Sequence, residues 1–180
     1  MWSIVLLLLV VVTGGCSMSQ ATSDSQSTER SPHRRAIPSD TFITLERTGC
    51  FGTCPIYKLE ISAGGKVVYE GKNFVKTKGK VEGNITQEQL GQLIAEFEKA
   101  NYFSLRDRYE GAEDGCPTSW TDNPSALTSI RIEGRSKSIS HDYGCREQDT
   151  GQAIGSPFPR ELTELEKKID EIAGTKRWVE

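Results

Sequence analysis

Residues 56–70 read IYKLEISAGGKVVYE, a pattern typical of two strands joined by a tight turn. In the first half Tyr57, Leu59 and Ile61 alternate with polar residues, so they share one face of a strand. A Gly-Gly pair follows, and glycine supplies the positive φ that a tight turn needs. Lys66–Glu70 then returns as the second strand. The stretch therefore predicts an antiparallel pair with one apolar face.

More strands are predicted on both sides of this hairpin. Thr41–Arg47 alternates well enough for a strand, and Phe74–Val81 reads as a fourth strand that follows the hairpin. Further along, Leu127–Ile132 and Ser136–Tyr143 predict a second hairpin, which turns at Glu133-Gly134. The strands therefore fall into two groups.

One amphipathic helix is predicted after each group of strands. The first begins at Thr86, where TQEQ forms a capping box that satisfies free backbone N–H groups, and the second spans about Pro159–Ala173. Apolar residues recur at helical spacing and must face a core: Leu90, Leu93, Ile94 and Phe97 in the first helix, Leu162, Leu165, Ile169 and Ile172 in the second. The order predicts an α+β domain, a largely antiparallel sheet of about six strands with both helices packed on one face.

The amino terminus carries the pattern of an export signal. Residues 4–12 read IVLLLLVVV and are followed by TGGC, which ends at Cys16. A run this short does not span a bilayer, which needs about 20 apolar residues, but it fits the hydrophobic region of a signal peptide. We therefore expect residues 1–15 to be a lipoprotein signal and Cys16 to be the lipidated mature terminus. An ordinary cleaved signal, with Cys16 incidental, is the alternative.

The segment after the signal predicts a tether. Residues 16–39 are rich in Ser, Thr and Gln and poor in apolar side chains, a composition that stays disordered. A single domain then occupies residues 40–180, a usual length for one domain. The expected location is the bacterial cell envelope, with the lipid on Cys16 in the membrane. Ser17 favours the outer membrane, with the domain facing the periplasm.

Charge and cysteine content narrow the function further. The formal net charge is -3, so there is no basic field of the kind that binds nucleic acid. Apart from Cys16 the chain has four cysteines, Cys50, Cys54, Cys116 and Cys145. An even number in an exported protein predicts two disulfides, and three connectivities are open.

The stretch RTGCFGTCPIY, residues 47–57, resembles the signature of an uncharacterised bacterial family of exported proteins, domain of unknown function 6438. The similarity covers most of residues 42–178, including the first hairpin, TDNP at 121–124 and the last helix. The family has no assigned activity, so the resemblance implies a fold and an exported location only. Cys116 and Cys145 depart from the family pattern, and two cysteines added together suggest a bond to each other. The favoured pairing is therefore Cys50–Cys54 and Cys116–Cys145.

Cys50 and Cys54 also admit a chemical interpretation. The spacing Cys-x-x-x-Cys-Pro suits a redox dithiol or a Cu(I) site, because soft thiolates bind Cu(I). Such motifs open a helix whose N-terminus lowers the thiol pKa, whereas Pro55 here leads into a predicted strand. A local disulfide staple is favoured. A zinc site made of all four cysteines lacks the usual second Cys-x-x-Cys, so no metal or other cofactor is expected.

Three other groups of polar residues suggest a function but have simpler structural interpretations. His141 beside Asp142 suggests a hydrolase, but no Gly-x-Ser-x-Gly elbow exists and strand neighbours face opposite ways, so a half-buried structural His141 is expected. The acidic loop suggests calcium without the EF-hand order and is expected to be solvated: Asp107, Glu110, Glu113, Asp114 and Asp122. Alternating lysines on one predicted strand face suggest a polyanion site, but edge protection is favoured: Lys76, Lys78 and Lys80.

Together these patterns predict a non-catalytic envelope lipoprotein whose disulfide-stabilised domain binds an envelope protein or a cell-wall partner. The alternative from another class is a periplasmic thiol-redox or Cu(I)-handling protein that uses Cys50 and Cys54.

Overall fold

The computed structural model of the chain describes residues 36–148 and 155–180, which form one compact α+β unit. The predicted signal, Cys16 and most of the tether lie outside the described residues. Residues 36–39 are described, and Ile37 packs against the core. No helix in the described part of the chain is long and apolar enough to span a membrane.

A seven-stranded sheet forms one layer of the unit, in the order β4-β3-β2-β1-β7-β8-β5. Every neighbouring pair is antiparallel except β5 with β8, which is parallel. The strands are β1 (Phe42–Arg47), β2 (Ile56–Ser62), β3 (Lys66–Asn73), β4 (Gly79–Asn84), β5 (Arg108–Tyr109), β7 (Ser125–Ile132) and β8 (Arg135–Asp142). A second, two-stranded sheet joins β6 (Thr118–Ser119) to β9 (Cys145–Arg146).

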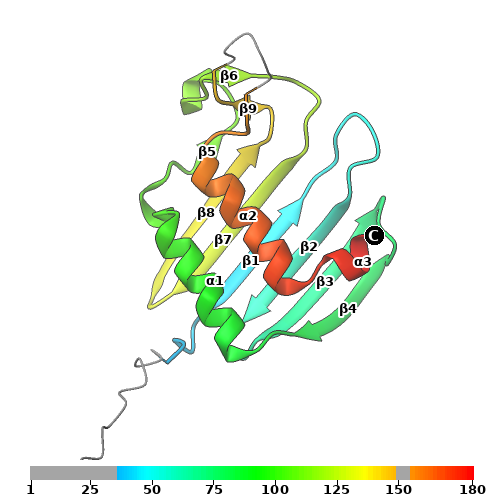
Figure 1. Cartoon of the computed structure of the whole chain (residues 1–180), viewed down its shortest axis with the longest axis vertical. Coiled ribbons are helices and arrows are strands. Elements are labelled where there is room, and N and C mark those ends of the chain that lie inside the picture. The colour runs from blue at the N-terminus through cyan, green and yellow to red at the C-terminus, as the bar shows by residue number, and fades with distance from the viewer. Residues whose placement is uncertain (1–35, 149–154) are drawn as a thin grey trace, which may run out of the picture. The chain divides into compact units, whose positions relative to one another are not determined.

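Two long helices lie side by side across one face of the seven-stranded sheet (Figure 1). They are α1 (Gln87–Lys99) and α2 (Arg160–Ala173), and a short α3 (Lys176–Val179) ends the chain. Two 3₁₀ turns, η1 (Tyr102–Ser104) and η2 (Ala112–Asp114), follow α1. The predicted capping box is present, because Thr86 Oγ1 accepts from Gln89 N and Gln89 Oε1 accepts from Thr86 N.

The sheet differs from the prediction in the number of its strands, seven instead of about six, with a second small sheet beside it. The extra strands β5, β6 and β9 have two residues each. A strand that short shows no alternation in sequence, and its existence depends on a partner strand elsewhere in the chain.

The predicted strand Phe74–Val81 is wrong at its start, because β4 begins only at Gly79. Phe74 has φ 51°, a left-handed conformation that ends β3, and Lys76 N and Thr77 N bond to Val179 O and Trp178 O of the carboxyl terminus. Lys76 and Lys78 therefore lie outside the strand. Lys80 alone is on β4, the edge strand, where it pairs with Glu70. The lysines do not form a comb on one strand face.

The core lies between the sheet and the two long helices. Fully buried apolar side chains come from the inward face of β1, β2, β3, β7 and β8 and from both helices: Ile43, Leu45, Leu59, Ile61, Val67, Tyr69, Leu90, Leu93, Ala126, Ile139, Leu162 and Ile169. Burial of such side chains is the main term that stabilises the fold, about 1.5–3 kcal/mol each. No helix of the described residues lies on the opposite face of the sheet (Figure 1).

Candidate functional site

The Cys50–Cys54 pair closes a small ring in the loop between β1 and β2. The two sulfurs are bonded, and the ring is followed directly by Pro55 and by β2. The bonded pair is one of the two favoured from the sequence. The ring connects two strands, so no helix N-terminus lies at either cysteine to stabilise a thiolate.

The ring presents one aromatic side chain to solvent. Phe51, between the two cysteines, is 91 % exposed. Its backbone N–H donates to Asp122 O at 3.2 Å, and Gly52 N donates to Cys50 O at 2.8 Å. Gly52 has φ 152°, a backbone angle that residues other than glycine rarely adopt. The disulfide, the glycine and the bond to the neighbouring loop therefore hold Phe51 outward on a fixed support.

The loop that holds Asp122 carries a second exposed aromatic side chain, Trp120, which is 46 % exposed. Its backbone is fixed through Trp120 N to Gly144 O at 2.9 Å. We call the surface around Phe51 and Trp120 the distal surface. The chain enters the domain at one end of the sheet, and these two loops project from the other end (Figure 1).

The second disulfide, Cys116–Cys145, braces the same end of the domain. It joins the loop before β6 to β9, and both cysteines are buried, at 8 % and 0 % exposure. Together with the β6–β9 pairing it ties the long segment between β5 and β7 to the end of β8. Its position makes it a structural bond that supports the loop of Trp120.

A buried polar network links the sheet to α2. Arg47 of β1 donates to Asp170 Oδ2 through Nη2 at 2.8 Å and through Nε at 3.2 Å, and Tyr57 donates to Asp170 Oδ1 at 2.7 Å. Arg47 Nη1 also donates to the Tyr143 hydroxyl, which in turn donates to Glu166 Oε2 at 2.7 Å. The network joins four segments of the chain: β1, β2, the residue after β8 and α2.

His141 belongs to this network and is fully buried, where a half-buried side chain was expected. Its Nδ1 lies 3.0 Å from Glu166 Oε2, and Nε2 has no hydrogen-bond partner among the described residues. The inward parity of β8 places His141 under α2, which explains the deeper burial. At 0 % exposure His141 has no route to a substrate, and Asp142 points to the other face and bonds Gly144 N.

The two tyrosines of the network remain protonated at physiological pH. Burial raises the pKa of Tyr57 and of Tyr143 above the ordinary value, and the negative charge of Asp170 and Glu166 respectively raises it further. Both hydroxyls therefore donate hydrogen bonds to carboxylates. Because every carboxylate in the network faces a donor, the arrangement stabilises the helix on the sheet.

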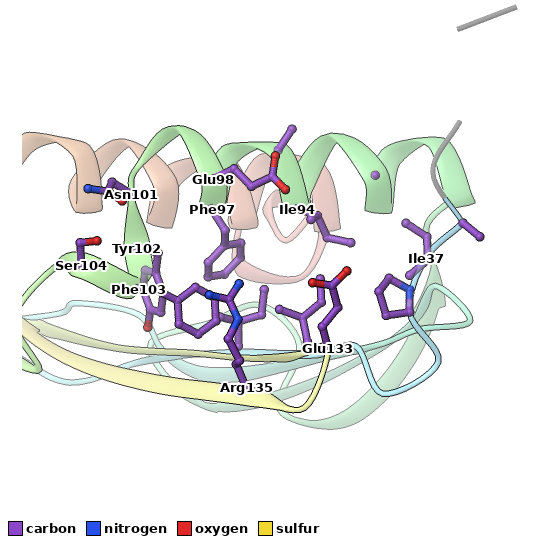
Figure 2. A pocket seen from close by; sticks show the side chains of 16 residues that line it. Ile37, Ile94, Phe97, Glu98, Asn101, Tyr102, Phe103, Ser104, Glu133 and Arg135 are labelled. Carbon is purple, nitrogen blue, oxygen red and sulfur yellow. The ribbon is translucent and has the colours of Figure 1, made fainter. Parts of the chain in front are cut away.

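A pocket of about 610 Å³ lies between α1, the first residues of the domain and the β7–β8 hairpin. Its walls are about equally polar and apolar, and the apolar part comes from Ile94 and Phe97 of α1, Phe103 after it, and Ile37 at the entry of the chain (Figure 2). Charged side chains stand at its rim: Glu98, Glu133 and Arg135. None of these rim residues was identified from the sequence.

The acidic loop does not gather into a cation site. Asp107 pairs with Lys137 at 2.6 Å, Glu110 accepts from Ser140 Oγ at 2.6 Å, and Asp114 pairs with Arg108 at 3.4 Å. Within residues 36–148 and 155–180 no three His, Cys, Asp or Glu side chains converge as a metal site would need.

Sequence reasoning missed the aromatic surface and the network for different reasons. Phe51 lies within the motif RTGCFGTCPIY, and its position between a cysteine and a glycine in a short ring indicates an exposed side chain. Arg47 stands at the inward parity of β1, after Ile43 and Leu45, so a charge at a core position was visible in the sequence. Its partner Asp170 lies 123 residues away, and nothing local identifies it.

One protein-family model matches most of the domain. The family model described as Domain of unknown function (DUF6438) matches residues 41–173. No curated protein matches the chain. The matched range runs from the start of β1 to the end of α2 and so includes the disulfide ring and the network, and all of the pocket lining except residues 36–38. The chain belongs to the DUF6438 family, a family of unknown function.

Proposed function

We propose that this protein is an exported, lipid-anchored envelope protein whose domain is a non-catalytic binding module, and that it docks a protein or cell-wall partner through the distal surface. The observation that supports the proposal most is Phe51, 91 % exposed on a ring closed by a disulfide. An exposed aromatic side chain on a braced backbone costs little backbone entropy on binding, and aromatic side chains dominate the energetics of interfaces.

The position of the distal surface fits an anchored protein. Cys16, the proposed lipidation site, precedes the domain, and the distal surface lies at the end of the sheet opposite to the entry of the chain (Figure 1). An attachment at the amino terminus would leave the end of the domain that carries Phe51 free of the anchored end. Feeding cells an alkyne fatty acid tests the anchor: the full chain should be labelled, Cys16→Ala should not, and an unlabelled full chain would refute the anchor.

The docking role is tested by retention on envelope material. Residues 17–180 contain the whole compact unit. This protein should co-sediment with washed envelope fractions, and Phe51→Ser should reduce the retained fraction about tenfold, the loss of a modest interfacial hot spot. The control is Lys66→Ser, an exposed side chain at the start of β3, the end of the sheet opposite to the ring. Equal retention of the Phe51→Ser variant and the unchanged protein would refute the proposal.

The thiol-redox or Cu(I) role remains the competing hypothesis, supported by the Cys-x-x-x-Cys-Pro spacing on a solvent-facing loop. It requires that Cys50 and Cys54 be reduced readily. Alkylation followed by mass spectrometry of protein from the periplasm decides: both cysteines should be blocked before reduction and should resist mild reductant. Free thiols that take up Cu(I) would favour the competing hypothesis.

A further inference from the structure

We propose that the pocket under α1 is a second binding site, separate from the distal surface, and that it takes a small amphipathic ligand with an apolar body and a cationic group. The pocket lies at the end of the sheet where the β7–β8 hairpin turns, whereas the distal surface is at the other end (Figure 1). Its volume of about 610 Å³ falls in the range of small-molecule sites, about 300–1,000 Å³.

The apolar body would lie against the aromatic and aliphatic walls. Phe97 and Ile132 are buried at the base of the pocket, while Ile37, Ile94 and Phe103 are only partly covered by protein. Figure 2 shows Ile94 and Phe97 extending from the helix toward the sheet, with Phe103 and Ile37 at the two ends. Covering these partly exposed side chains removes apolar surface from water, which favours binding.

A glycine in the middle of α1 keeps the pocket open. Gly91 lines the pocket, and a Cβ added there would meet only Ile37 Cδ1, at 4.0 Å. A glycine inside a helix costs about 0.5–1 kcal/mol relative to alanine. No close contact at this position requires a glycine. The effect of Gly91 is therefore the space that the missing side chain leaves in the pocket. Ala95, one turn later, also lines the pocket with a small side chain.

Two carboxylates at the rim select a cation. Glu98 extends from α1, and Glu133 rises from the hairpin on the opposite side of the pocket (Figure 2). Neither side chain has a hydrogen-bond or ionic partner among the described residues. Among the described residues the one guanidinium at the rim is Arg135, which is stacked on Phe103, 4.1 Å from the ring centroid. The described rim therefore carries two carboxylates and one guanidinium, a net negative charge that favours an ammonium group over a carboxylate.

Calorimetric titration of residues 17–180 with two probes of the same length tests the proposal. Decylammonium should bind, and decanoate should bind several-fold more weakly. Decylammonium should shift the methyl resonances of Ile94 and Ile132 and should leave the resonances of the Phe51 loop unchanged. Glu98→Gln and Glu133→Gln should each reduce the affinity for decylammonium by about two- to five-fold, the range expected for partly exposed ion pairs.

Gly91→Leu is the variant that fills the pocket, and Gly91→Ala is its control. Leucine should abolish binding of decylammonium, while alanine should leave most of it, and both variants should fold. Decanoate binding as tightly as decylammonium, or undiminished binding by Gly91→Leu, would overturn the proposal. A large gain in affinity when Arg30, Arg34 and Arg35 are changed to glutamine would also overturn it, because the chain's own basic segment would then be the occupant.

Discussion

At the residue scale, the contact between Arg47 and the two carboxylates of α2 explains how a charged side chain is accommodated in the core. Arg47 retains 12 % of its side-chain exposure and Glu166 none. Three segments that are distant in sequence supply the donors and acceptors, so each group is neutralised or hydrogen-bonded. A satisfied buried network adds specificity to the placement of α2, whereas a broken one leaves a charge unpaired in a medium that solvates it poorly.

Removal of Arg47 should therefore be expensive. Arg47→Met should lower the free energy of unfolding by about 3–5 kcal/mol, because Glu166 would remain fully buried, and Asp170 partly buried, without their cation. The control is Lys72→Met, which breaks the exposed pair with Glu46 and should change stability by about 1 kcal/mol or less. Urea unfolding of both variants measures the difference, and similar losses in the two would contradict this account of the network.

The buried tyrosines predict a loss of stability at alkaline pH. The pKa of Tyr57 and of Tyr143 is raised in the folded protein by burial and by the nearby carboxylates. Below the unfolded value of about 10 both states are protonated and the contribution to stability is complete. As the pH rises from there toward the folded pKa, only the unfolded phenols ionise, so each tyrosine costs up to about 1.4 kcal/mol of stability per pH unit.

This pH dependence is measured by urea unfolding across the alkaline range, with phenolate absorbance recorded on the folded protein. Tyr57→Phe should make the decline in stability shallower. Ionisation of every tyrosine near its ordinary pKa in the folded protein would contradict the burial of these two hydroxyls.

At the element scale, α1 has a well-capped N-terminus and, at Gly91, a residue of low helix propensity. The capping box at Thr86 satisfies the first N–H groups, and Leu90, Leu93 and Phe97 are buried against the sheet. Gly91 lies on the flank of this apolar stripe, at the pocket. The helix is therefore held by its packing and its cap, and it tolerates a residue with poor helix propensity.

Gly91→Ala should stabilise the protein by about 0.5–1 kcal/mol, because alanine restricts the unfolded chain and its Cβ fits without a close contact. The control is Gly71→Ala in β3, where an added Cβ would overlap Thr77 O and should be destabilising. Thermal unfolding of the two variants should show shifts of opposite sign, and a lowered melting temperature for Gly91→Ala would contradict the open space described beside it.

The elements most predictable from sequence were those with a local signal. The hairpin in residues 56–70, the helix after Thr86 and the last helix each carry their period and their turn or cap within a short stretch. The start of β4 could not be found this way, because Phe74 and Lys76 take their conformation from contacts with Trp178 and Val179 at the far end of the chain. The pocket was equally hidden, since its rim joins α1 to a hairpin more than 30 residues later.

At the scale of the whole molecule, the two disulfides stabilise the same end of the domain in different ways. Cys50–Cys54 closes a ring with a sequence separation of 4, and Cys116–Cys145 closes a loop with a separation of 29. In the chain-entropy description, the longer loop removes more freedom from the unfolded state. The short ring is therefore better suited to fix a local shape than to stabilise the fold.

Replacement of each cysteine pair by serine should separate these roles. Loss of Cys116–Cys145 should cost about 3.6 kcal/mol and loss of Cys50–Cys54 about 2 kcal/mol. Denaturant unfolding gives both values. A larger loss from the Cys50–Cys54 pair would contradict the assignment of this ring as a local support for Phe51.

The central claim is that Phe51 contacts a partner in the envelope, and site-specific photo-crosslinking in living cells tests it most directly. A photoreactive phenylalanine analogue is placed at Phe51 in one protein and at Lys66 in a matched one, since both side chains are exposed and Lys66, at the start of β3, lies at the end of the sheet opposite to the ring. The account predicts a discrete crosslinked product from position 51 and none from position 66. No product from position 51, or the same products from both positions, would contradict it.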